Sequence, residues 1–414
     1  MARRSLLRRW LSVSLTVLGI AVSVAMILAV ERIRLETREN FTQTVAGTDL
    51  IVGSRTSPVQ LLLYSVFRIG DATANIRYSS FEKISRHPQV RWAVPLSLGD
   101  SHRGFRVVGT TPDYFEHLRV AGDRSLSFAS GERLAERFDA VLGASVARAL
   151  GYEVGTEIVV AHGTRDDGLS SHDTLPFKVV GVLEFTGSPV DQAVYVGLEA
   201  IEAIHIGWES GTRVAGDELD RDEATEVEIE VESITAFFLG LERRSAALQF
   251  QRAINGFPDE PLTAILPGVA LNELWRLFGN VELALLAVAV LTVVTGLIGM
   301  VVGLLSTLGE RRREMAVLRA LGARPLDLCS LLFFESALIA LAGALLGYGL
   351  LTLALAIANP LLASDFGVSF STGLPTLREG SLLAAVLGLA LIAAVLPAWQ
   401  AYRLSLRDGL HAGV

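Results

Sequence analysis

A short charged segment between two apolar runs holds the residues best suited to a specific interaction. Positions 310–325 read Glu-Arg-Arg-Arg-Glu-Met-Ala-Val-Leu-Arg-Ala-Leu-Gly-Ala-Arg-Pro. Met315, Leu318 and Leu321 recur every three residues, which places them on one helical face. Gly322 and Pro325 then end the helix. The pattern predicts an amphipathic helix at the membrane surface that docks on another protein.

The docking prediction divides the segment into apolar residues that would fill a groove and charged residues that would set orientation and partner choice. The assigned residues are Glu310, Arg312, Arg313, Glu314, Met315, Leu318, Arg319, Leu321 and Gly322. The alternative is a loop whose arginines only hold membrane orientation. That alternative needs charge, but it needs neither an apolar stripe nor a glycine stop.

Glu335 is a second candidate, because it interrupts the apolar run that follows the charged segment. A carboxylate inside a membrane span is costly and often functional. It lies only about seven residues into the span, near enough to the interface to reach water or an arginine. We favour interfacial pairing and keep a functional role as the alternative.

Motifs for catalysis, metal binding and nucleotide binding are missing from the sequence. The histidines follow no recognised metal spacing, and a zinc site at His162 and His172 with nearby aspartates is less favoured than a polar loop. No Gly-x-x-x-x-Gly-Lys-Ser/Thr loop occurs, and no serine-hydrolase elbow occurs. We therefore predict a non-enzymatic chain with no cofactor and no metal site of its own. We also expect no nucleic-acid partner, because basic residues do not cluster with aromatic ones.

Four apolar runs supply the elements that position the charged segment. They cover Trp10–Val30, Leu283–Gly309, Leu328–Ala358 and Leu382–Trp399, each long enough to cross ~30 Å of hydrocarbon. A cleaved signal peptide is the alternative for the first run, but that run is longer than a typical signal core. Closely spaced glycines predict helix–helix seams in the second and third runs. These glycines are Gly296, Gly299, Gly303, Gly343, Gly347 and Gly349.

Arginine placement predicts the orientation of these spans. The leader, the charged segment and the C-terminal tail are all basic and flank the spans on one side, which we assign to the cytoplasm. We divide the chain into eight parts with alternating location. These are a leader with the first transmembrane helix (1–30), an extracytoplasmic domain (31–280), a second helix (281–309), a cytoplasmic helix (310–327), a third helix (328–358), an outer loop (359–381), a fourth helix (382–402) and a cytoplasmic tail (403–414).

The large outer segment has the mixed pattern of an α+β domain. Short β-branched runs closed by glycine or polar turns predict strands at 105–109, 140–143, 157–160 and 177–182. Helices are expected at 80–87, 144–150 and 243–254. The acidic stretch 217–232 alternates valine or isoleucine with glutamate, which predicts a strand with one wet face and is preferred to a cation site. The fold class is thus a four-helix membrane protein with a large α+β extracytoplasmic domain between helices 1 and 2.

The charged segment resembles the coupling helix of ABC transporter permeases of the FtsX/MacB/LolC type. That family shows a pattern like G-E-R-R-x-E-x-x-x-L-R-A-L-G-A after its second span, matched here by Gly309 through Ala323. The fourth span ends in Pro397-Ala398-Trp399, as is typical of the family. Segments such as Val108-Gly109-Thr110-Thr111-Pro112 are similar to its periplasmic domain, which is built of two mixed subdomains. The resemblance weakens over 198–280.

The resemblance implies a permease subunit in a bacterial inner membrane, with both termini cytoplasmic. A separate ATPase chain would bind ATP and Mg²⁺, and a second permease would complete a homodimer or heterodimer. A periplasmic adaptor or lipoprotein could be a further partner, besides the membrane lipids. The work would be export or extraction of a lipoprotein, peptide or drug. The alternatives are an FtsX-like regulator of an outer partner such as a cell-wall hydrolase, and a permease linked to metal handling.

Overall fold

The computed structural model describes residues 2–408 apart from 46, 121–123, 163–174, 207–220, 311–316, 318–320 and 367–369. These residues form two compact units. One consists of 1–36, 279–359 and 370–414, and the other of 37–278 and 360–369. The first unit is helical and the second is a mixed α/β domain, so the predicted fold class is confirmed.

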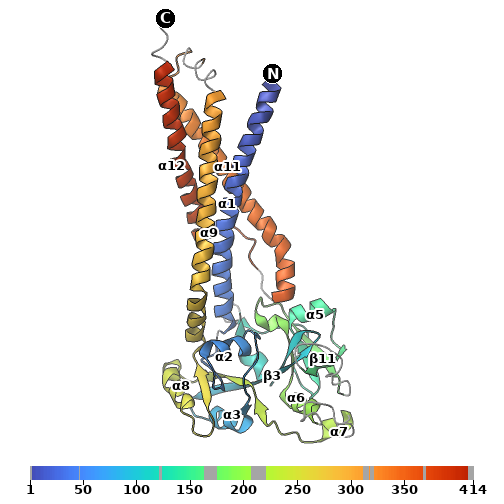
Figure 1. The fold of residues 1–414 in the computed structure, drawn as a ribbon. Coiled ribbons are helices and arrows are strands. Elements are labelled where there is room, and N and C mark those ends of the chain that lie inside the picture. The colour runs from blue at the N-terminus through green and yellow to red at the C-terminus, as the bar shows by residue number, and fades with distance from the viewer. Residues whose placement is uncertain are drawn as a thin grey trace. The chain divides into compact units, whose positions relative to one another are not determined.

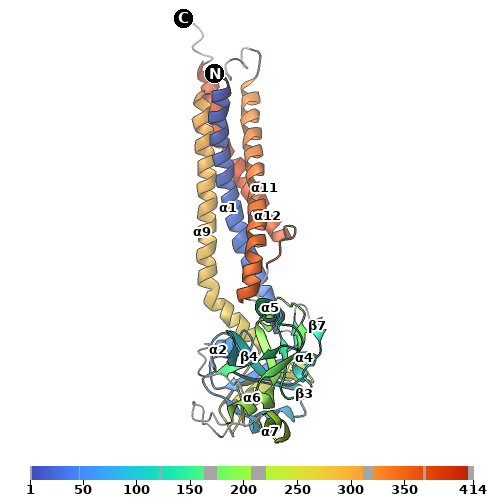
Figure 2. The same cartoon turned by 90° about the vertical axis from the view of Figure 1, so that its right-hand side faces the viewer.

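Four long helices make up most of the first unit: α1 (Ala2–Thr44), α9 (Pro267–Glu310), α11 (Pro325–Phe366) and α12 (Leu377–Asp408). All four are long and apolar enough to cross a membrane. With 43 residues, α1 would be about 65 Å long, roughly twice the hydrocarbon thickness. The helices therefore extend beyond the apolar runs that predicted them. The N-terminal end of α1 and the C-terminal end of α12 lie at the same end of the bundle (Figures 1 and 2).

The packing of the bundle explains why its apolar residues divide into two sets. Small and branched side chains such as Val24, Ala289 and Ala344 are buried between the helices. Large side chains such as Leu291 and Ile392 are more than 60% exposed on the outside. Since lipid tails are as apolar as leucine, this exposed surface suits a hydrocarbon environment.

Helix α1 packs against α9 and α11 through glycines. A Cβ atom at Gly296 would lie 2.6 Å from the Ser23 hydroxyl oxygen. One at Gly347 would lie 2.5 Å from the carbonyl oxygen of Ala21. Gly303 and Gly343 approach α1 in the same way, so four of the six predicted seam glycines are confirmed.

The seam prediction was wrong for Gly299 and Gly349, where an added Cβ would meet nothing within 4 Å. The physical reason is the helical period. Gly349 follows Gly347 by two residues, and a turn of about 200° places it on nearly the opposite side of α11. Gly299 is turned by about 60° from the direction shared by Gly296 and Gly303.

The mixed domain is organised by one sheet with the strand order β15-β1-β14-β3-β4-β12-β8-β11-β7. Its strands are β1 (Leu50–Ser54), β3 (Val90–His102), β4 (Phe105–Thr110), β7 (Phe128–Gly131), β8 (Asp139–Leu142), β11 (Phe177–Leu183), β12 (Ala193–Gly197), β14 (Ala236–Leu241) and β15 (Leu262–Ile265). Two further short strands join at the sides, β9 (Glu157–Ile158) on β11 and β10 (Ala161–His162) on β3. Separate two-stranded ladders pair β2 (Ile76–Arg77) with β13 (Ser233–Ile234), and β5 (Arg119–Val120) with β6 (Arg124–Ser125).

Strand β3 joins the two halves of this sheet. Its first part pairs antiparallel with β14, from Val90 opposite Leu241 to Leu96 opposite Ala236. Its second part, from Ser97 to His102, pairs antiparallel with β4. The pairs β4–β12 and β8–β11 are parallel, so the second half of the sheet is mixed.

Short helices cover the sheet and close its hydrophobic clusters. They are α2 (Pro58–Ser65), α3 (Tyr78–Ser85), α4 (Asp113–His117), α5 (Ala144–Leu150), α6 (Leu198–His205), α7 (Arg221–Glu226) and α8 (Ala247–Asn255). The predicted helix 144–150 coincides with α5, which ends at Gly151 in the left-handed conformation. The predicted helix 80–87 appears as α3, where Phe81 and Ile84 are buried as expected.

The predicted strand in the acidic stretch was wrong. Residues 217–220 lie outside the described part, α7 occupies Arg221–Glu226, and none of 227–232 is a strand residue. Two contacts with distant parts of the chain favour the helix. Ala224 is fully buried, and the Arg137 guanidinium donates to the carbonyl oxygens of Ala224 and Val227 at the helix end. A cation at a helix C-terminus satisfies carbonyl groups that have no partner within the helix.

Candidate functional site

The predicted docking segment lies mostly outside the described residues. This applies to Arg312, Arg313, Glu314, Met315, Leu318 and Arg319. Glu310 is the last residue of α9. Leu321 is 80% exposed, and its amide donates to the Val317 carbonyl oxygen at 3.1 Å, which is the spacing of one helical turn.

The end of the segment is fixed by a turn and a cap. Gly322 has φ +100°, a conformation that side chains disfavour, and α11 begins three residues later at Pro325. The Arg324 amide donates to the Asp327 carboxylate at 2.7 Å, which satisfies a donor at the start of α11. The assignment of the nine docking residues stays a prediction.

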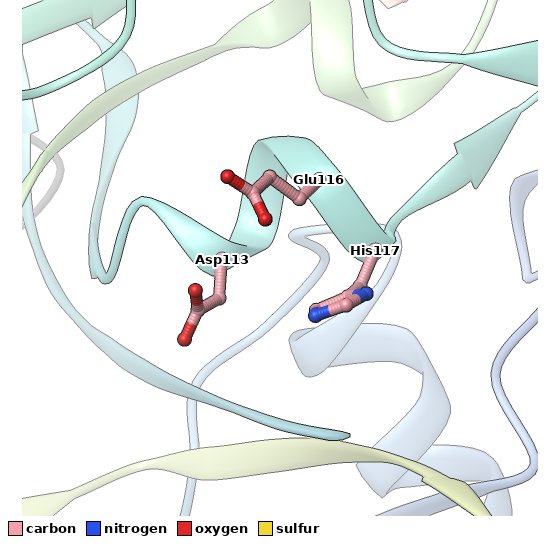
Figure 3. Close-up of side chains that lie close together, drawn as sticks. All are labelled: Asp113, Glu116 and His117. Carbon is pink, nitrogen blue, oxygen red and sulfur yellow. The ribbon is translucent and has the colours of Figure 1, made fainter. Parts of the chain in front are cut away.

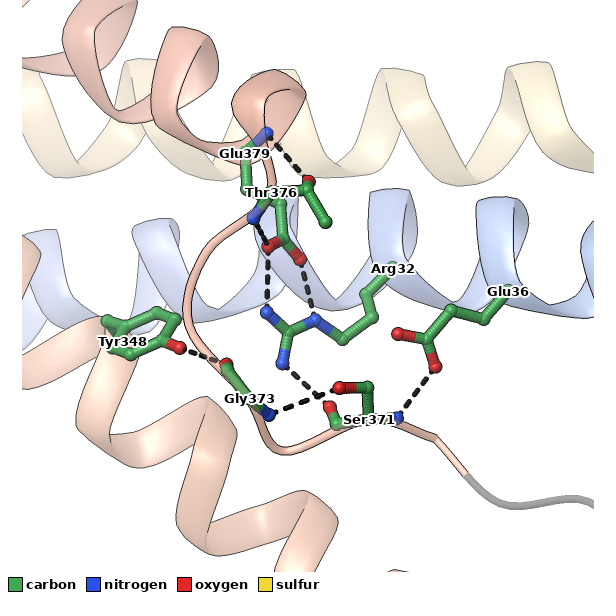
Figure 4. A network of polar contacts seen from close by, with 7 residues as sticks. All are labelled: Arg32, Glu36, Tyr348, Ser371, Gly373, Thr376 and Glu379. Atoms are coloured by element: carbon green, nitrogen blue, oxygen red, sulfur yellow. Dashed lines mark hydrogen bonds and ion pairs between the residues drawn. The ribbon is translucent and has the colours of Figure 1, made fainter.

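A buried ion pair connects α1 to α12 within the helical unit. Arg32 Nε donates to Glu379 Oε1 at 2.6 Å, and Arg32 Nη2 donates to Glu379 Oε2 at 2.7 Å. The side chains are only 3% and 1% exposed. This parallel arrangement of two hydrogen bonds is the strongest form of an arginine–carboxylate contact. Figure 4 shows the two side chains facing each other.

Glu379 is held in place by the start of its own helix. Thr376 precedes α12, and its amide donates to Glu379 Oε2 at 2.8 Å. In return the Glu379 amide donates to the Thr376 hydroxyl oxygen at 3.3 Å. This is a capping box, in which residues three apart satisfy each other's backbone donors. The capping carboxylate thus also serves as the partner of Arg32.

The segment before α12 is bound to the same cluster. Arg32 Nη1 donates to the Ser371 carbonyl oxygen at 2.8 Å, and the Ser371 amide donates to the Glu36 carboxylate at 2.8 Å. From α11, the Tyr348 hydroxyl donates to the Gly373 carbonyl oxygen at 2.5 Å (Figure 4). The Arg32 guanidinium also lies 5.9 Å from the Tyr348 ring centroid. We call Arg32, Glu36, Tyr348, Ser371, Gly373, Thr376 and Glu379 the Arg32 cluster.

The Arg32 cluster serves to hold three helices and a connecting segment in one arrangement. An unpaired charge at such a buried place would cost several kcal/mol, so the pair resists separation of α1 from α12. The sequence analysis missed this cluster. The signal that could have found it is Thr376-x-x-Glu379 immediately before an apolar run, which is the signature of a capping box.

Glu335, the second candidate from the sequence, is half-buried on α11 and does not belong to the Arg32 cluster. Its expected pairing with water or an arginine stays a prediction. The alternative zinc site at 162–173 lies almost entirely outside the described residues, so the structure says nothing of it.

Asp113, Glu116 and His117 form the one described group whose ligand atoms could approach a single ion (Figure 3). Their spacing within α4 accounts for this proximity, because residues three and four apart share a helix face. Glu116 forms an ion pair with Arg133, and His117 stacks on Trp92 with ring centroids 5.1 Å apart. These contacts give two of the three groups a structural role in the surface of the domain.

Two family models together cover most of the chain. The MacB-like periplasmic core domain matches residues 10–236, which is more than half of the sequence. The FtsX-like permease C-terminal domain matches residues 285–406, the region of α9, α11 and α12. The two matches divide the chain close to the end of the mixed domain.

Two curated relatives match over nearly the whole chain. A pyoverdine export ATP-binding/permease protein of Pseudomonas syringae is 24% identical over 86% of this chain and 51% of its own length. A macrolide export ATP-binding/permease protein of Paracoccus denitrificans is 23% identical over 96% of this chain and 56% of its own length. The chain therefore spans about half the length of these relatives.

Two solved structures show a weak likeness to this chain. The periplasmic region of MacB from Actinobacillus actinomycetemcomitans aligns at 12% identity and a TM-score of 0.35, over 57% of this chain and 95% of that one. The extracellular domain of the noncanonic ABC-type transporter YknZ from Gram-positive bacteria aligns at 11% identity and a TM-score of 0.30, over 53% and 99%.

Proposed function

The chain belongs to the FtsX/MacB-type family of ABC transporter permeases, and on this premise we propose that it converts ATP hydrolysis by a partner ATPase into movement of the mixed domain. This domain would lie outside the cytoplasm, and we call it the outer domain. The observation that supports this proposal is the Arg32 cluster. It ties α1, which continues into the outer domain, to α11 and α12. A displacement of the segment between α9 and α11 would then move several helices together.

The proposed path begins at the charged segment 310–325. ATP binding would close the ATPase subunits, and Met315, Leu318 and Leu321 would follow them because they fill an apolar groove on that partner. The first two spans, α1 and α9, would transmit the movement, since both contain residues of each compact unit. A second permease would complete the assembly as a homodimer or heterodimer, with both termini in the cytoplasm.

We further propose export or extraction as the direction of the work. The names of the two curated relatives, pyoverdine export and macrolide export, favour this direction. The outer domain would act on its substrate outside the cytoplasm, with or without an adaptor protein. Both relatives are named ATP-binding/permease proteins, whereas the nucleotide-binding loop motif is absent from this sequence.

The coupling proposal is tested by reversing charge in the docking segment. The chain is purified from its native membranes together with the ATPase that accompanies it, and ATP hydrolysis is measured per complex. Arg312→Glu combined with Arg319→Glu should release the ATPase or remove its stimulation by the permease, because the orienting charges repel their former partners.

A matched control changes the same net charge elsewhere. Arg86→Glu with Arg91→Glu alters two exposed arginines of the mixed domain and should leave both ATPase recovery and hydrolysis unchanged. Normal recovery and normal hydrolysis in the Arg312/Arg319 variant would refute the assignment of the docking segment. If a cell-wall hydrolase were recovered with the outer domain in place of an exported compound, the result would instead favour the alternative function, an FtsX-like regulator of that hydrolase.

A further inference from the structure

A cleft of about 600 Å³ opens in the surface of the mixed domain. It lies among the C-terminal end of α1, the loop that follows α2, the β3–β4 hairpin and the loop before β12. Its volume falls within the range of small-molecule sites, roughly 300–1,000 Å³. Every lining residue belongs to the same compact unit.

Three arginines are the only charged residues among those described as lining the cleft: Arg68, Arg103 and Arg106. Arg106 is compensated by an ion pair with Asp71 at 2.8 Å. Arg68 donates to the Ser65 carbonyl oxygen and to the Tyr114 hydroxyl, and no described carboxylate pairs with it. Its Nε is buried without a hydrogen-bond partner. Arg68 therefore brings to the lining of the cleft a positive charge that no described carboxylate compensates, and one of its buried donors is unused.

The backbone at two of these arginines is unusual. Arg68 has φ +60° and Arg103 has φ +47°, and they are the only residues other than glycine with positive φ in the described chain. This left-handed conformation costs an L-residue free energy that a glycine would not lose. Strained residues of this kind gather at ligand sites, where the side chain is needed in that place. Here both strained residues line one cleft.

Aromatic rings give the cleft an apolar side. Phe41 stacks on Phe67 with ring centroids 4.2 Å apart, and Phe105 from the β3–β4 hairpin contributes a third ring. Phe67 is almost fully buried, whereas Phe41 and Phe105 are half-buried. A ligand would thus find guanidinium groups and aromatic surface side by side.

From this juxtaposition we propose that the cleft binds an anionic amphiphile, with its oxyanion headgroup on Arg68 and Arg103 and its apolar chain on the phenylalanine wall. Guanidinium groups bind carboxylates and phosphates through two parallel hydrogen bonds. A free fatty acid and an anionic phospholipid share this chemistry. The proposal goes beyond the transport function, because binding requires neither the ATPase nor the docking segment.

The test uses the full chain in nanodiscs of zwitterionic phosphatidylcholine. The probe is a palmitate that carries a photoreactive diazirine, and mass spectrometry locates its adducts after irradiation. We expect adducts on peptides that contain Phe41, Phe67 or Phe105. An excess of oleate should suppress them, while uncharged methyl oleate should not.

Two variants separate binding from folding. Arg103→Gly removes an exposed guanidinium and relieves the positive φ, so the protein should remain at least as stable. Arg68→Gly relieves the same strain but also removes the hydrogen bonds to Ser65 and Tyr114, so thermal unfolding of this variant is measured beside its binding. Each should weaken the probe's apparent affinity about tenfold, the loss expected for one charge-assisted contact. Arg86→Gly, an exposed arginine on a different surface, serves as the control for lost charge and should leave the probe's affinity unchanged.

The source of the headgroup follows from a second competition. If phosphatidylglycerol in the nanodiscs suppresses the probe adducts and oleate does not, the ligand is a phospholipid. If oleate suppresses them and phosphatidylglycerol does not, the ligand is a fatty acid. Either result supports an anionic amphiphile. Equal suppression by methyl oleate, adducts outside the cleft peptides, or unchanged affinity in both glycine variants would overturn the proposal. Loss of ATPase coupling affects none of these measurements.

Discussion

Arg32 and Glu379 are 347 positions apart in the sequence, yet their charged groups meet through two hydrogen bonds of 2.6 and 2.7 Å, with both side chains almost completely buried. Because the pair is buried, neither side chain can turn to water as an alternative partner. Because Glu379 also caps α12, the orientation of that helix and its attachment to α1 depend on the same carboxylate. One ion pair therefore links the first span to the last.

The ion pair predicts a strong and non-additive response to mutation. Arg32→Gln or Glu379→Gln alone should destabilise the protein by roughly 3–5 kcal/mol, because each leaves the other charge buried and unpaired. The double variant should lose less than the sum of the two. Thermal unfolding of the full chain in detergent measures this, with Arg86→Gln as the control. Arg86 pairs with Glu82 on the exposed surface of α3, so its loss should cost under about 1 kcal/mol. Additive losses would contradict the buried pair.

The glycine seam predicts opposite effects at two positions of α11. Gly347→Ala would bring a Cβ to 2.5 Å from the Ala21 carbonyl oxygen, a backbone atom that cannot move aside, and should lower stability by about 1–3 kcal/mol. Gly349→Ala meets nothing and should be neutral or slightly stabilising, since alanine favours helix by about 1 kcal/mol. Melting temperatures of both variants in detergent decide this. A similar loss at both positions would mean that α1 does not pack on Gly347.

The spans were predictable from the sequence because burial in lipid leaves an unbroken apolar run, and no other environment requires one. Short strands such as 140–143 and the helix 144–150 were also predictable from glycine stops and local pattern. The helices were longer than their apolar runs. In α1, for example, Arg32 and Glu36 lie beyond the apolar run and form hydrogen bonds with Ser371, and hydropathy cannot predict such contacts.

The acidic stretch and the Arg32 cluster show where local pattern fails. Alternation around Val227 favoured a strand, but burial of Ala224 and the capping by Arg137 are contacts with distant parts of the chain. The partner of Arg32 could not be found from spacing, because a pair separated by 347 positions is set by how the helices pack. The sequence contains the capping-box pattern Thr376-x-x-Glu379, but nothing in it indicates that the Glu379 carboxylate also pairs with Arg32.

The proposed orientation predicts which positions a membrane-impermeant reagent can reach. In a Cys329→Ala background, Ser130→Cys places a thiol on an exposed strand of the mixed domain, and Leu321→Cys places one on the 80% exposed residue after α9. A charged maleimide added to intact spheroplasts should label position 130 at once. Position 321 should react only after the membrane is opened. Labelling in the reverse order would invert the topology.

Asp191 predicts a pH dependence of outer-domain stability. Its carboxylate is fully buried and accepts hydrogen bonds from the amides of Thr186 and Gly187 at 2.7–3.1 Å. Burial raises the pKa of Asp191 to about 6, although these hydrogen bonds act in the opposite direction. Because the folded pKa lies above the unfolded value of about 3.9, the site's stabilisation is complete below pH ~4 and is lost as the pH rises through ~6.

Asp191→Asn removes this titration, so the wild type and the variant should differ in how steeply the free energy of unfolding changes with pH. The free energy of unfolding of the wild type relative to the variant should fall by about 2 kcal/mol between pH 4 and pH 7, because most of the effect of the two-unit pKa difference falls inside this range. Asp259→Asn is the control of opposite sign, since an ion pair with Lys83 lowers the pKa of that exposed carboxyl and its small contribution is lost on acidification. Thermal unfolding of the full chain across this range measures both. A constant offset between wild type and Asp191→Asn would show that the buried carboxyl keeps one charge state in the folded protein, with its hydrogen bonds outweighing burial.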